Sequence, residues 1–210
     1  MSAHDYNAYR MAHDLEVVVY SVDYSLGLRA QFPDALNETI NAYGAVAKKY
    51  RKVLVVGSSA GANLLITTIL NARAGKADPP EAAGLFAPSV DLRISGDSCV
   101  ANDGRDPLLT RDAASKLIAA YLGATPPTNT NASPILANYS QGFVPTIITT
   151  GTRDLLQSDS VRLYWKLRDA KATVQLRIWE GMWHAFEGVP HLPEGEQNMR
   201  EVFDFLEHHI

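Results

Sequence analysis

A serine with the spacing of an activated nucleophile lies in the stretch VLVVGSSAGANLLIT. Ser59 has Gly57 two residues before it and Gly61 two residues after it, between an apolar run and a helical pattern. In a sharp strand-to-helix turn, this spacing strains the serine backbone and projects its hydroxyl group, and side chains at the two glycine positions would clash. Ser58 does not fit the pattern, because Val56 occupies its first glycine position. The sequence therefore predicts that Ser59 is a nucleophile.

A serine hydroxyl needs a base, and the base needs a third group that orients it. Asp154 and His184 follow Ser59 in the chain, and each comes just after an apolar, strand-like run. The carboxyl ends of parallel strands meet at one edge of a sheet, so we expect the three side chains to converge there. His184 would accept the proton of Ser59, and Asp154 would hold the imidazole. The backbone N–H of Ala60, at a helix N-terminus, would face an oxyanion beside Ser59.

Other interpretations of these residues stay open. Asp154 could cap the following helix, although Ser158 or Asp159 suits that position better. Asp159 and Glu187 are rival acids for the base, and His184 could be a structural loop histidine. Four further residues beside the three candidates are predicted to bind substrate: Ser58, Leu155, Trp183 and Phe186.

The elements that must position these side chains alternate along the chain. Five short apolar runs predict strands at Glu16–Tyr24, Val53–Gly57, Ala82–Pro88, Pro145–Gly151 and Thr173–Gly181. Helical patterns fall between them, from Pro33 to Tyr50, from Ser59 to about Gly75, across Thr110–Leu122, from about Ser158, and from Pro193. Alternation of this kind predicts an α/β fold with a mostly parallel sheet and helices on both faces. Consecutive apolar residues within the runs suit strands that are covered on both sides.

The length of the chain predicts a single domain over residues 1–210. Residues 91–140 form a long polar excursion between two strands, a segment that could cover the site. A net charge of -4 does not favour binding to nucleic acid, and no apolar run is long enough for a membrane span. The single cysteine, Cys99, and the polar first residues favour a cytoplasmic protein. No metal-ligand or phosphate-loop motif is present, so neither a metal nor a cofactor is expected.

Five motifs together resemble the hormone-sensitive-lipase-like branch of the α/β-hydrolases, the bacterial short-chain esterases. They are VVVYSVDYSLGLRAQFPDAL, GSSAGANL, LFAPSVDL, GTRDLLQSDS and WEGMWHAF, and they span nearly the whole chain. The resemblance carries the roles of nucleophile, acid and base onto Ser59, Asp154 and His184. It implies hydrolysis of short acyl esters through an acyl-enzyme, without cofactor or metal.

One departure from the family bears on activity. The family's oxyanion loop, His-Gly-Gly-Gly, would precede the first motif, and no such sequence occurs here. The resemblance therefore predicts a chain that lacks the family's N-terminal strands and cap, with impaired activity. The alternative is a non-catalytic relative that binds a small ligand, as in the plant gibberellin receptors that resemble this family but lack its histidine.

The same departure predicts an empty position in the sheet. In the family, the strand before the oxyanion loop lies between those matching Val17–Asp23 and Val53–Gly57. Either these two strands pair directly, or another segment fills the position. We favour a filled position, because the later motifs keep family-like spacing; a missing N-terminal segment or a second copy in a homo-oligomer would supply the strand.

Overall fold

The fold is known from a computed structural model that describes residues 3–27 and 30–209. Its sheet has four strands in the order β1-β2-β3-β4, and every neighbouring pair is parallel. The strands are β1 (Leu54–Ser58), β2 (Ala82–Phe86), β3 (Thr146–Gly151) and β4 (Val174–Trp179). Four of the five predicted strands are therefore present, within two residues of their predicted bounds.

Seven α-helices surround the sheet in the part of the chain described. They are α1 (Ala3–Asp14), α2 (Asp34–Lys49), α3 (Ala60–Asn71), α4 (Ser98–Ala101), α5 (Arg111–Leu122), α6 (Gln157–Asp169) and α7 (Pro193–Glu207). Short helical turns cover η1 (Ala72–Lys76), η2 (Pro134–Leu136) and η3 (Phe186–Gly188). The five predicted helices correspond to α2, α3, α5, α6 and α7. Helix α1 was not expected from the sequence.

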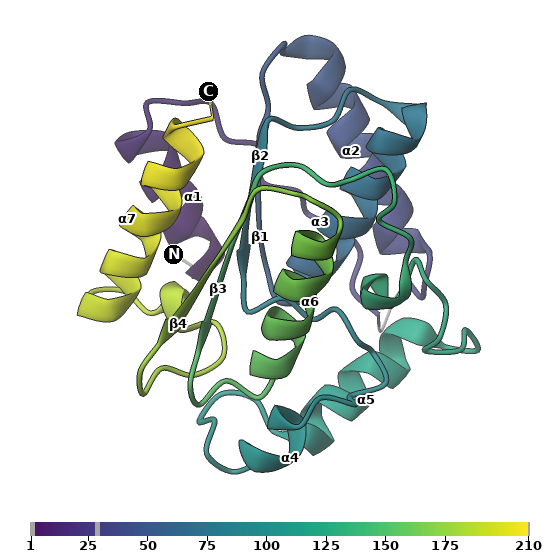
Figure 1. Ribbon diagram of the computed structural model, residues 1–210, viewed down its shortest axis with the longest axis vertical. Helices are drawn as coiled ribbons and strands as arrows, with labels where there is room; N and C mark the ends of the chain where they lie inside the picture. The colour runs from purple at the N-terminus through teal and green to yellow at the C-terminus, as the bar shows by residue number, and fades with distance from the viewer. Residues whose placement is uncertain (1–2, 28–29, 210) are drawn as a thin grey trace.

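The sheet is covered by helices on both faces, as predicted (Figure 1). On one face, Ile148 of β3 packs with Ile66 of α3 and Leu163 of α6. On the other face, Ile147 packs with Val202 of α7, and Met11 of α1 lies at the edge of this cluster. Adjacent strand residues point to opposite faces, so Ile147 and Ile148 belong to different cores. Both cores are apolar, which explains the unbroken apolar runs of the buried strands.

The strand predicted at Glu16–Tyr24 is not formed, and this prediction is wrong. The segment is irregular chain, and Val18, Tyr20 and Val22 have 68%, 47% and 39% of their surfaces exposed. Direct pairing with β1 is also excluded within the described residues, because β1 has β2 as its one neighbour there. The run has the residue types of a strand, but a strand forms only where another strand pairs with its backbone groups.

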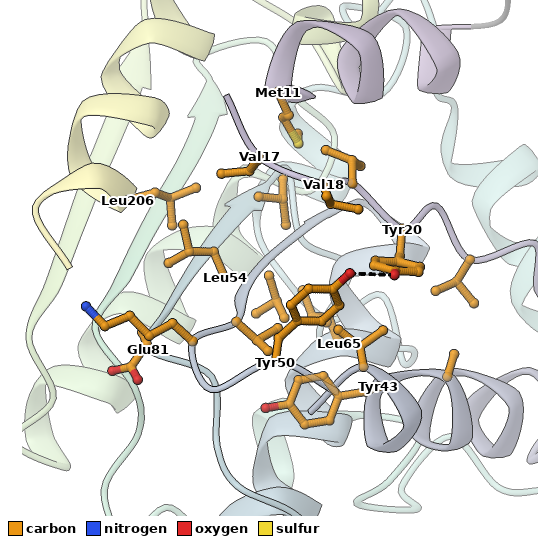
Figure 2. Close-up of a pocket in the computed structure, with 18 of the residues that line it drawn as sticks. Met11, Val17, Val18, Tyr20, Tyr43, Tyr50, Leu54, Leu65, Glu81 and Leu206 are labelled. Carbon is orange, nitrogen blue, oxygen red and sulfur yellow. Dashed lines mark hydrogen bonds between the residues drawn. The ribbon is translucent and has the colours of Figure 1, made fainter. Parts of the chain in front are cut away.

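A groove separates this segment from β1 (Figure 2). Its volume is about 410 Å³, and its lining includes Val17 and Val18 on one side and Leu54 on the other. The phenol groups of Tyr20 and Tyr50 bond to each other at 2.8 Å and tie the segment to the chain after α2 (Figure 2). The position beside β1 is thus neither closed by direct pairing nor filled by any described part of the chain.

Candidate active site

The turn between β1 and α3 has the strained geometry that the sequence predicts. Ser59 has φ 51° and ψ -115°, a backbone conformation that residues with a side chain rarely adopt. The N–H of Ser59 donates to the carbonyl of Phe86, and its own carbonyl accepts from Asn63 and Ser89. These bonds hold the turn to β2 and to the first turn of α3. The strain is therefore maintained by the surrounding backbone.

The two glycines of the motif have different surroundings. A Cβ atom on Gly57 would lie 2.9 Å from the backbone N and Cα of Ala62, so this glycine is required by the close approach of strand and helix. A Cβ atom on Gly61 would meet only the hydroxyl of Tyr24 at 3.8 Å, an ordinary contact. The predicted clash is present at Gly57, and the prediction for Gly61 is wrong, since the second residue of α3 faces away from β1.

Ser59, His184 and Asp154 form one chain of hydrogen bonds. The His184 Nε2 atom lies 2.8 Å from Ser59 Oγ, and its Nδ1 atom lies 2.9 Å from Asp154 Oδ1. The three residues follow β1, β3 and β4, and they meet because parallel strands end at the same edge of the sheet. Asp154 is fully buried and His184 is 5% exposed. The arrangement has the geometry of a nucleophile, a base and an orienting acid.

The carboxylate of Asp154 is fixed by further bonds. The hydroxyl of Thr150 donates to Oδ2 at 2.6 Å, and the N–H of Leu156 donates to Oδ1 at 2.8 Å. Asp154 thus caps the turn before α6 and bonds to His184 at the same time. The rival Asp159 accepts from the backbone N–H groups of Val90 and Asp91 and does not contact the imidazole.

The second rival acid, Glu187, is bound to the nucleophile turn. Its Oε1 atom accepts from the hydroxyl of Ser58 at 2.6 Å, and its Oε2 atom has no partner among the described residues. Burial raises the pKa of Glu187, although the Ser58 hydrogen bond opposes this rise. Burial alone would lower the pKa of His184, but the negative charge of Asp154 and its hydrogen bond outweigh burial, so the pKa of His184 is raised.

The remaining predicted residues divide into two groups. Ala60 is the first residue of α3, so its N–H is one of the free donors of a helix N-terminus beside Ser59. Trp183 is partly exposed next to His184. Leu155 and Phe186 are 0% and 1% exposed and pack in the interior, so a substrate contact by either residue has no support here.

Residues that the sequence analysis missed support both loops of the site. The side-chain amide of Asn102 donates to the carbonyl of Asp154 at 2.9 Å, and the carboxylate of Asp106 accepts the N–H of His184 at 3.2 Å. A Cβ atom on Gly151 would lie 2.1 Å from the carbonyl oxygen of Met182, so the end of β3 touches the histidine loop. The glycine in TTGTRD was the one available signal of this close approach. Polar residues in a loop, such as Asn102 and Asp106, carry no comparable pattern.

Across residues 3–27 and 30–209, no group of three His, Cys, Asp or Glu side chains is arranged to hold a metal ion. Over the same residues, no helix has the length and apolarity needed to cross a membrane.

Comparison with known proteins agrees with the fold and the resemblance. A family model described as alpha/beta hydrolase fold matches residues 1–188, and the chain belongs to this family. An esterase from Acinetobacter venetianus is 27% identical over 93% of this chain and 66% of its own length. Mouse hormone-sensitive lipase is 34% identical over 53% of this chain and 16% of its own length.

Solved structures that resemble this chain are also esterases. An esterase/lipase from an uncultured bacterium superimposes with a TM-score of 0.92 at 27% identity, over 98% of this chain and 70% of that one. Esterase E25 superimposes with a TM-score of 0.90 at 32% identity, over 97% of this chain and 64% of that one. A further neighbour is an esterase from the bacterial hormone-sensitive lipase family, with a TM-score of 0.84 at 26% identity, over 90% of this chain and 64% of that one. The chain spans about two thirds of the length of the curated bacterial relatives it matches.

Proposed function

We propose that the protein is a serine hydrolase that cleaves short-chain carboxylic esters through an acyl-enzyme. The observation that carries the proposal is the hydrogen-bond chain from Ser59 through His184 to Asp154, at 2.8 and 2.9 Å. Ser59 is the nucleophile, His184 is the general base and acid, and Asp154 orients the imidazole. The proposal is supported further by the esterases among the relatives, which align over most of this chain.

The steps follow from the positions of these atoms. As Ser59 Oγ attacks the ester carbonyl carbon, His184 Nε2 accepts its proton, and the carbonyl oxygen becomes an oxyanion. The protonated imidazole then donates this proton to the leaving alcohol as the ester bond breaks. Water then attacks the acyl carbon as His184 Nε2 takes its proton. The bond from this carbon to Ser59 Oγ breaks, the carboxylic acid leaves, and the imidazolium returns the proton to Ser59 Oγ. Asp154 stabilises the imidazolium and does not itself take the proton.

Stabilisation of the oxyanion is the part of this mechanism for which the chain offers the fewest hydrogen-bond donors. The N–H of Ala60 is the candidate donor, and no His-Gly-Gly-Gly sequence occurs among the 210 residues. Loss of one oxyanion donor in a related site lowers turnover by roughly 100- to 1000-fold. We therefore expect slow hydrolysis by the chain alone.

A cytoplasmic location stays a prediction from the sequence.

We further propose that an extended strand from outside these 210 residues completes the sheet beside β1. The proposal is supported by the apolar groove of about 410 Å³ between β1 and the irregular segment Val17–Val22. The groove lies along a strand edge whose backbone N–H and C=O groups favour pairing with another strand. The bacterial relatives are longer than the matched region, so chains of this class contain further residues that could supply such a strand. A second copy of the chain in a homo-oligomer is the alternative occupant.

Hydrolysis of nitrophenyl esters tests the proposed activity. We expect the acetate and butyrate to be cleaved faster than long-chain esters, and Ser59→Ala to remove the activity. A variant that keeps the wild-type rate would show that another group is responsible. A wild-type protein that binds these esters without cleaving them would favour the ligand-binding alternative.

A further inference from the structure

One carboxylate outside the three candidate catalytic residues bonds to both of the loops that carry acid and base. The Oδ2 atom of Asp106 accepts the N–H of Leu155 at 2.9 Å and the N–H of His184 at 3.2 Å. Its Oδ1 atom accepts the N–H groups of Leu108 and Leu109 at 2.9 and 3.1 Å. The residue is 3% exposed. Four backbone donors therefore converge on one buried carboxylate.

We propose that Asp106 is a positioning residue that sets the separation between Asp154 and His184. Leu155 is the residue next to Asp154, and the second donor belongs to His184 itself. Because both donors bond to the same oxygen atom, the loops after β3 and β4 are tied at one point. The inference rests on the proposed function of these loops. Asp106 touches none of the reacting atoms, so it acts through the two residues that it holds.

The neighbours of Asp106 strengthen this interpretation. The amide of Asn102 donates to the carbonyls of Thr152 and Asp154 at 3.2 and 2.9 Å. The guanidinium of Arg153 donates to the carbonyl of Arg105 at 2.9 and 2.6 Å. Residues 102–106 therefore form several hydrogen bonds to the loop that carries Asp154. In this way the long excursion between β2 and β3 holds the site in place.

The chemistry of the side chain makes the role testable. A carboxylate has acceptor oxygens on both sides, whereas an amide has an oxygen on one side and an N–H donor group on the other. In Asp106→Asn, one pair of backbone N–H groups would face another donor, although the side chain keeps nearly the same shape. We expect the loops to separate by a small distance that breaks the alignment of His184 with Ser59.

Asp159→Asn is the matched control. Asp159 is likewise buried, at 1% exposure, and its Oδ2 atom accepts two backbone N–H groups, from Val90 and Asp91 at 2.9 Å each. Its carboxylate makes no hydrogen bond to His184 or to Leu155. Both variants should lower the thermal stability, but only Asp106→Asn should alter the geometry at His184.

The experiment measures the rate at which a fluorophosphonate labels Ser59 in folded wild-type protein and in the two variants. We expect Asp106→Asn to slow labelling by roughly 10-fold or more, because small misplacements of reacting groups are costly. Asp159→Asn should label at nearly the wild-type rate. Equal labelling of Asp106→Asn and wild type, or equal slowing in both variants, would overturn the inference.

A second readout separates this inference from the proposed function. The imidazole Nδ1 proton of His184, bonded to Asp154, should give a downfield NMR resonance that is lost in Asp106→Asn and kept in Asp159→Asn. An unlabelled wild-type protein would contradict the proposed function, and this resonance would still decide the role of Asp106. If Asp106→Asn does not fold, Asp106→Glu, which keeps both acceptor oxygens on a longer side chain, replaces it with the same expected directions.

Discussion

In the proposed mechanism, the imidazole of His184 determines the pH range in which Ser59 can react. Burial opposes its charge, but the charge and hydrogen bond of Asp154 raise the pKa of His184 above its usual value of 6.5. Only the neutral imidazole accepts a proton, so labelling of Ser59 should fall as the pH is lowered through this raised pKa. In a pH series, the pH at which the labelling rate is half-maximal should therefore lie above 6.5.

Asp154→Asn provides the comparison for this pH series. The substitution removes the charge that raises the pKa of His184 and leaves the imidazole buried. The pH at which the labelling rate is half-maximal should therefore be lower in the variant. The maximal rate should fall as well, because a neutral amide does not stabilise the imidazolium as the carboxylate does. Two results would contradict the role given to Asp154: a pH of half-maximal labelling below 6.5 in the wild type, or the same pH of half-maximal labelling in the wild type and the variant.

The residues that the sequence identified share a local or topological signal. Ser59 has a five-residue motif, and Asp154 and His184 follow strand-like runs, so the convergence of all three follows from strand direction alone. Asp106 has no such signal for its link to the site, because the two donors that matter there, the N–H groups of Leu155 and His184, belong to residues far along the chain. The burial of Leu155 and Phe186 depends on packing between helices and loops, which the sequence pattern does not specify.

Among the elements, α6 is bound to the start of the long excursion by an ion cluster with two buried carboxylates. The guanidinium of Arg162 bonds to Asp91 at 2.7 Å and to Asp159 at 2.6 Å, and both carboxylates are at most 2% exposed. Arg162→Ala removes this partner from two buried charges. We expect the free energy of unfolding, measured in urea, to fall by about 3 kcal/mol.

Lys116→Ala is the control for the ion cluster. Lys116 and Asp112 lie one helical turn apart in α5, and both side chains are 75% exposed. Exposed pairs of this kind contribute little, so the free energy of unfolding should hardly change. Similar losses in Lys116→Ala and Arg162→Ala would show that burial does not distinguish the two pairs.

The elements were predictable where periodicity and pairing agree. The four strands of the sheet are short apolar runs, and the helices between them have a repeating apolar face. The run at Glu16–Tyr24 has the same residue types but no strand beside it, so it stays irregular. A sequence pattern describes what a segment can bury, whereas its pairing depends on which other segments are present.

At the scale of the whole molecule, the open edge of β1 is the principal difference from a completed sheet. The carbonyl of Val53 accepts from Glu81, and the N–H of Ser59 donates to Phe86, so these residues face β2. Alternate residues face the same neighbour in a parallel ladder, which turns the N–H groups of Leu54 and Val56 toward the groove. In the isolated chain, these two amides should exchange hydrogen faster than the amide of Val55.

Concentration distinguishes the occupants of the groove. A strand from outside these 210 residues leaves both amides fast in the isolated chain at every protein concentration. Protection of Leu54 and Val56 that increases with concentration would identify a second copy of the chain instead. Slow exchange at all concentrations would show that the groove is closed in solution.

Activation of Ser59 by His184 is tested most directly by mass spectrometry of the native protein after reaction with a fluorophosphonate. The predicted result is one adduct on the peptide that contains Ser59. The adduct should be absent from Ser59→Ala and from unfolded protein, and His184→Ala should slow its formation severely. An adduct on another residue, equal labelling of the unfolded chain, or no adduct at all would contradict the assignment of Ser59 as the nucleophile.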